Sequence, residues 1–135
     1  MTTSEDTAAG RRLAEQLIHL LAEDGAGADE LLAGLTDVRE LVFVGAALTA
    51  VARSEGRRLP PAQRAQASTR QVRLGRLRDA QRGDPEGLRT WLRRAAEEIL
   101  VLRTLRAAAE RVAQDERTAA SATGSINTSS PATST

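Results

Sequence analysis

The residues able to perform acid–base or metal chemistry are few and scattered in this sequence. His19 is the only histidine and cysteine is absent, so thiol nucleophiles and the common zinc sites are excluded. Glu15 and Glu23 stand one helical turn to either side of His19, and such carboxylates predict a surface ion pair rather than a general base. The adjacent acids at 29–30 and 97–98 face apart on a helix. We therefore expect no catalytic, cofactor-binding or metal-binding residues, and a small enzyme is only the third hypothesis for function.

Arginine is the one reactive residue type present in number. All nineteen basic residues are arginine, and the guanidinium group suits bidentate contacts to phosphate or carboxylate. The same bias, together with abundant alanine and glycine, is typical of codon usage in a high-GC bacterial genome. The arginines are concentrated: residues 57–94 hold eleven against three acids, whereas residues 1–56 hold ten acids against four arginines. So dense a cationic segment either binds polyanions or neutralises an acidic face of its own protein.

An accessory DNA-binding protein is the alternative hypothesis for this segment. The six arginines that would contact phosphates are Arg64, Arg70, Arg73, Arg76, Arg78 and Arg82. Two aromatic residues in the whole chain, Phe43 and Trp91, provide few stacking platforms, and the six arginines do not fall on one helical stripe. The competing hypothesis is that the segment lies across the acidic first helix and the turn at 29–40, in its own molecule or in a sister subunit.

The elements that would position these residues are helical. Leucine, alanine, arginine and glutamate lose little rotamer freedom in a helix, and 135 residues allow one domain. We therefore predict an all-α fold, a small bundle of about four helices with a long C-terminal helix and a disordered tail. The expected segments are a helix over 7–24, a helical turn over 29–35, and helices over 37–54 (capped by Thr36 and closed by Gly56), 62–82 and 85–117. The expected core residues are Leu17, Leu21, Leu41, Val44, Leu48, Trp91, Ile99, Leu102 and Leu105.

The helix over 37–54 is apolar on nearly every side. Such a helix forms either the centre of a bundle or part of a dimer interface. A membrane span is not expected, because the uncharged run over 41–52 is shorter than the roughly 20 residues that a bilayer requires.

The sharpest local signal is the run from Gly83 to Gly87. Gly83 can end one helix, Asp84 can cap the next, and Pro85 suits its first position. The helix that follows has four-three apolar spacing, which favours packing along a partner helix within the bundle or across a dimer. Residues 119–135 are rich in Ser, Thr and Ala, which predicts a disordered tail.

Together these patterns predict one helical domain over 1–118, with 57–84 as a peripheral arginine-rich segment. We expect a cytoplasmic location, because residues 1–10 are polar and acidic, unlike a secretory signal. The function that we expect is that of a non-enzymatic interaction module, self-associating as a homodimer, which holds or regulates a macromolecular partner. That partner is the chain itself or another protein, with DNA as the alternative. No cofactor, membrane or small-molecule substrate is implied.

Overall fold

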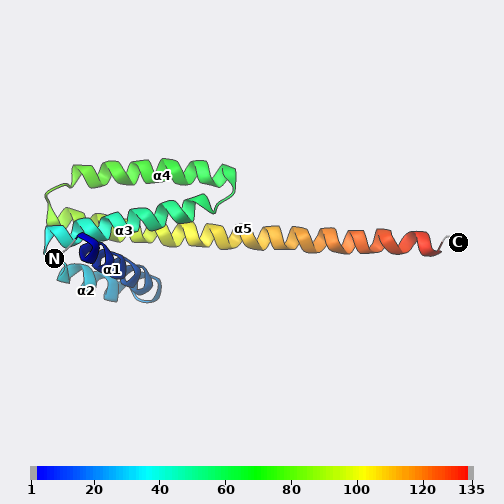
Figure 1. The fold of residues 1–135 in the computed structure, drawn as a ribbon, viewed down its shortest axis with the longest axis horizontal. Helices are drawn as coiled ribbons and strands as arrows, with labels where there is room; N and C mark the ends of the chain where they lie inside the picture. Colours follow the sequence, from blue (N-terminus) through cyan, green and yellow to red (C-terminus); the bar gives the residue numbers. More distant parts are fainter. Residues whose placement is uncertain (1–2, 134–135) are drawn as a thin grey trace.

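The fold consists of helices joined by short connections (Figure 1). The computed structural model describes the backbone of residues 3–133 and the side chains of residues 4–122. Within that range the chain contains no strand, which confirms the all-α class. The helices are α1 (Thr3–Glu23), α2 (Gly25–Gly34), α3 (Val38–Arg57), α4 (Pro61–Ala80) and α5 (Pro85–Thr133). The segment predicted as a helical turn is thus a complete helix, α2.

Helix α3 occupies the centre of the bundle, with α1 along one side and α5 along another. Of the nine expected core residues, seven are buried, while Leu21 and Leu105 are half-buried against the same cluster. Burial of one large aliphatic side chain contributes about 1.5–3 kcal/mol relative to an exposed one, so this cluster is the main source of stability. The crossing of α1 and α3 is close, because Gly10 packs directly against the backbone of Phe43.

Aspartate side chains set the starts of α2 and α3. Asp24 Oδ1 accepts a hydrogen bond from the Ala26 amide at 3.0 Å, and Asp37 Oδ1 accepts one from the Arg39 amide at 3.0 Å. The expected cap of α3 at Thr36 is therefore wrong by one residue. Asp37 is itself extended, and its carboxylate reaches the second amide of the helix, which is the usual capping geometry. At its other end α3 continues past the expected stop, through Gly56 to Arg57.

The start of α5 follows the predicted pattern. Gly83 has φ of 87°, a backbone conformation that glycine adopts readily. Asp84 Oδ1 accepts a hydrogen bond from the Glu86 amide at 3.2 Å, and the Asp84 carbonyl accepts one from the Leu88 amide at 2.9 Å. Asp84 and Pro85 thus perform the roles expected of them. Helix α4, however, ends at Ala80 with Gln81 as its C-cap, so Gly83 belongs to the connection and does not itself end the helix.

Helix α5 extends well beyond the other helices (Figure 1). It continues to Thr133 instead of ending near residue 117, and among its side chains described up to residue 122 the last buried one is Leu102. The predicted disordered tail over 119–135 concerns residues most of whose side chains lie outside the described part of the chain, and it stays a prediction. No helix in the described residues is both long enough and apolar enough to cross a bilayer.

Candidate functional site: the groove between α3 and α4

Helix α4 is the least embedded helix of the bundle. It runs antiparallel to α3 along one side (Figure 1) and buries only Ala67 and Leu74. It packs against α3 and α5 and, in the described part of the chain, does not contact α1 or α2. The hypothesis that residues 57–84 cover the acidic first helix is therefore wrong within one molecule, whereas coverage of a sister subunit stays a prediction.

Other arginines neutralise the acidic half. Arg39 of α3 lies 2.7 Å from Asp6 of α1, and Arg93 of α5 pairs with Asp29 of α2. Each pair joins two helices that are distant in the sequence. The arginines of α4 do not pair with these acids of α1 and α2: Arg70 pairs with Glu98 of α5, and Arg78 and Arg82 lie near Asp79.

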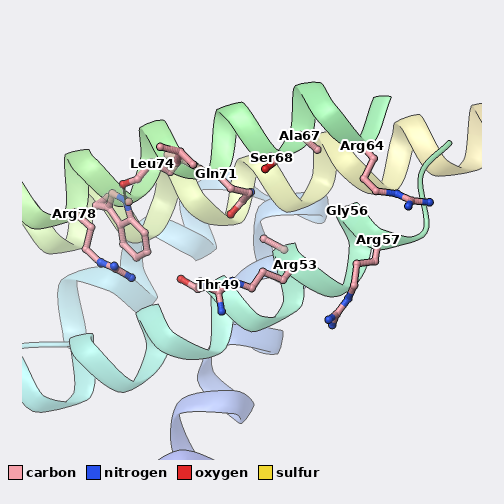
Figure 2. A pocket seen from close by; sticks show the side chains of 14 residues that line it. Thr49, Arg53, Gly56, Arg57, Arg64, Ala67, Ser68, Gln71, Leu74 and Arg78 are labelled. Atoms are coloured by element: carbon pink, nitrogen blue, oxygen red, sulfur yellow. Dashed lines mark hydrogen bonds between the residues drawn. The ribbon is translucent and has the colours of Figure 1, made fainter. Parts of the chain in front are cut away.

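A cavity of about 550 Å³ separates α3 from α4 (Figure 2). Its apolar lining includes Ala52 from α3, Ala67 and Leu74 from α4, and Trp91 from α5. It stays open because the side chains that face each other are small. A Cβ atom built at Gly75 would meet no atom within 4 Å, and one at Gly56 would meet only Ala67, at 3.9 Å.

A second cavity, of about 290 Å³, continues the first toward the start of α3. Val38, Val42 and Gly45 form its α3 side, and Leu88 closes one end. Arg78 and Trp91 line both cavities. We call the two cavities together the α3–α4 groove.

Trp91 holds the two walls of this groove in place. The indole is buried, and its Nε1 donates a hydrogen bond to the Leu74 carbonyl of α4 at 2.7 Å. The Arg78 guanidinium lies over the indole ring, 5.7 Å from its centroid, within range of a cation–π contact. Arg70 of α4 adds an ion pair with Glu98 of α5 at 2.8 Å. These contacts attach α4 mainly to α5, which leaves its side toward α3 open.

The groove explains why α3 is apolar nearly all round. One face packs on α1 and another on α5. A third face turns toward the groove, because Val38, Val42, Gly45 and Thr49 recur at three- and four-residue intervals. Val42 is 55% exposed on this third face. The sequence left a bundle centre and a dimer face as alternatives, and α3 combines a central position with one uncovered face.

The electrostatics of the groove are one-sided. Arg53 and Arg57 enter from α3, Arg64 and Arg78 from α4, and no described residue lining either cavity is acidic. In Figure 2, Arg57 and Arg64 lie at one end, Arg78 at the other, and Arg53 beside Thr49 between them. Like charges held at a concave, low-dielectric surface raise the local positive potential and attract anions.

The pairing of these arginines differs. Arg53 and Arg57 have no acidic partner among residues 4–122. Arg64 donates to the Leu59 carbonyl at 3.1 and 3.3 Å. The α3 pair is therefore the least neutralised part of the groove.

The six arginines proposed for DNA contact do not share a face. Arg64, Arg78 and Arg82 line the groove, and Arg70 pairs with Glu98. Arg82 lies 3.3 Å from Asp79. The remaining two, Arg73 and Arg76, lie together on the outer surface of α4 and make no ion pair within the described side chains.

Sequence reasoning missed Arg53, Arg57 and Gly75 as site residues. Their signal was present but weak: polar and small residues interrupt apolar helices at three- and four-residue spacing. Trp91 was expected in the core, and it is buried there while also lining both cavities.

His19, the remaining candidate for acid–base chemistry, lies on the surface. His19 Nε2 lies 3.3 Å from Glu23 Oε2 on an exposed face, as predicted. Among the described residues no group of three side chains could hold a metal ion. No known protein family, curated protein or solved structure matches this chain.

Proposed function

We propose that this chain is a non-enzymatic interaction module that holds a macromolecular partner in the α3–α4 groove. The observation that carries the proposal is the third face of α3, which is flanked along one side by α4 and bordered by Arg53 and Arg57, two arginines without an acidic partner among residues 4–122. An apolar face left open on an otherwise packed helix is typical of an interaction surface.

A protein partner fits this surface better than duplex DNA does. The floor is apolar and recessed, whereas phosphates need protruding basic side chains. The outer face of α4 offers only Arg73 and Arg76 for such contacts. Neutralising two phosphates would give a shallow salt dependence, with a slope of about −2 in log–log terms.

Self-association is the second part of the proposal, and it concerns α5. Past the bundle, α5 exposes Val112 to 57%, and Val101 is 38% exposed nearer the core. A long helix that extends beyond its own bundle is marginally stable in water unless another helix packs along it. A homodimer paired through α5 would provide that helix. Light scattering of the free protein tests this part, and a monomer mass at all concentrations would contradict it.

The groove itself can be tested before any partner is known. Trp91 is the only tryptophan, so energy transfer from it to bound anilinonaphthalene sulfonate, an anionic apolar dye, reports occupancy. We expect transfer in the unaltered protein and its loss in Gly75→Leu, whose side chain fills the cavity from a position with free space. Equal transfer in both proteins would place the dye elsewhere and refute the groove as a site.

The DNA alternative is tested by titrating random duplex DNA at roughly 50 and 200 mM salt. We expect weak binding at the lower concentration, abolished by the double variant Arg73→Glu/Arg76→Glu. Tight binding with a steep salt dependence would favour the DNA alternative over the protein-partner proposal.

A further inference from the structure

We infer that the groove accepts an amphipathic helix of a partner protein, apolar along the half that meets Val38 and Val42 and acidic along the half that meets Arg53 and Arg57. This inference rests on the proposed function, and it adds the conformation and the charge pattern of the partner.

The length of the groove favours a helix. The face of α3 that lines the two cavities extends from Val38 to Arg57, and these 20 residues span about 30 Å at 1.5 Å per residue. The two cavities lie end to end along it, on either side of Arg78 and Trp91. Packed helices lie 8–10 Å apart, and Gly56 and Gly75, which both line the larger cavity, leave room for that approach. A partner helix lying in such a groove is a recurrent mode of peptide recognition.

The polarity of the groove orients that helix. The cavity near the start of α3 is lined mostly by aliphatic residues and Trp91. Arg78 and Arg82 also line it, and both lie within ion-pair distance of Asp79. At the other end Arg53 and Arg57, four residues apart, project from one side of α3. Carboxylates spaced four residues apart on the partner would face both guanidinium groups. A small amphiphile with one anionic head group would pair with only one of Arg53 and Arg57 and would leave the other without an acidic partner.

The partner must bring the acids, because the described groove residues provide none. Arg53 and Arg57 are exposed in the free protein, so hydration satisfies them there. A helix laid over them excludes that water, and a covered charge without a counter-charge opposes binding. Acidic residues on the partner are therefore a condition of tight docking.

The test uses a synthetic helical peptide of about 20 residues without tryptophan, with leucine at three- and four-residue spacing in one half and glutamate pairs four residues apart in the other. Trp91 fluorescence reports binding, and circular dichroism reports helix formation. We expect binding of the Leu/Glu peptide. We expect affinity about tenfold lower or worse for a peptide with lysine in place of glutamate, because like charges then oppose the arginines.

Two double variants form a matched pair on the protein side. Arg53→Glu/Arg57→Glu alters the groove, whereas Arg73→Glu/Arg76→Glu makes the same charge change on the outer surface of α4. All four side chains are exposed, so both proteins should fold. We expect the groove variant to lose at least about tenfold in affinity and the control to change by about twofold at most.

The outcomes separate this inference from the proposed function. Dye binding without peptide binding overturns the helix inference and leaves the groove as a site for something else. If neither the dye nor the peptide binds, both the helix inference and the proposed function are overturned. Equal binding of the lysine peptide, or peptide binding unchanged by Gly75→Leu, would also overturn the inference, because the charge or the location would then be wrong.

Discussion

Two glycines in helix interiors provide a test of the packing on opposite sides of α3. Gly75 lies on the groove side of α4, and Gly10 lies on α1 against α3. Glycine in a helix interior is about 0.8–1.0 kcal/mol less favourable than alanine. Helix propensity alone therefore predicts that Gly→Ala stabilises the protein equally at both positions.

Packing predicts opposite effects on stability for the two substitutions. A Cβ atom at Gly75 meets nothing within 4 Å, so Gly75→Ala should raise the free energy of unfolding by about 1 kcal/mol. A Cβ atom at Gly10 would stand 2.8 Å from the carbonyl carbon and oxygen of Phe43. These are backbone atoms, so α1 and α3 must move apart across the core. Overpacking of this kind costs about 1–3 kcal/mol, and after the helix gain of about 1 kcal/mol we expect Gly10→Ala to be destabilising by up to about 2 kcal/mol.

Urea unfolding followed by far-ultraviolet circular dichroism measures both effects. In thermal unfolding, 1 kcal/mol corresponds to a shift of roughly 4 °C for a domain of this size. Stabilisation by Gly10→Ala would refute the close crossing of α1 and α3. A loss of stability in Gly75→Ala would mean that the groove is closed over Gly75 and is not available as a binding site.

Two further pairs of variants test the contacts of α5. Arg106→Leu should cost about 1.5–3 kcal/mol in urea unfolding, because the Glu55 side chain is 7% exposed and would keep only the hydrogen bond from Arg103 Nε at 3.3 Å. Glu55→Leu should cost only about 1 kcal/mol, because the Arg106 side chain that it leaves without this partner is 25% exposed. The reverse order would show that the carboxylate has access to solvent. Asp84→Ala should lower stability by about 1 kcal/mol in thermal unfolding, because it removes the cap of α5. Asp84→Asn should lower it by much less, because the amide oxygen can still accept the hydrogen bond. Equal losses in the two variants would show that the charge of Asp84, and not its hydrogen bond, stabilises the start of α5.

The helices themselves could be predicted because their signals are local. Apolar spacing of three and four residues identified α1, α3 and the first half of α5, and the run through Asp84 located the start of α5. Leucines on the same periodicity indicated the core, and Leu17, Leu48 and Ile99 are fully buried. Each of these features depends on residues within a few turns of one another, which the sequence displays directly.

The candidate site depended on contacts between residues distant in the sequence. The excess of arginine was visible in the sequence, but the spatial partners of the individual arginines were not: Arg70 faces Glu98, while Arg78 covers Trp91. Helix periodicity defines the faces of each helix and leaves open which face meets which neighbour.

The sequence by itself determined an all-helical chain, its main helix starts and most of its core. Only the tertiary structure decided that α4 packs on α3 and α5 and does not contact α1, and that Arg53 and Arg57 line the groove. The physical reason is that small residues such as Ala67 and Gly75 fill too little space to close α4 onto α3. The buried Trp91 nevertheless holds α4 in place through its hydrogen bond to Leu74. An open, basic groove therefore remains between two helices whose separate sequences predict only that each is a helix.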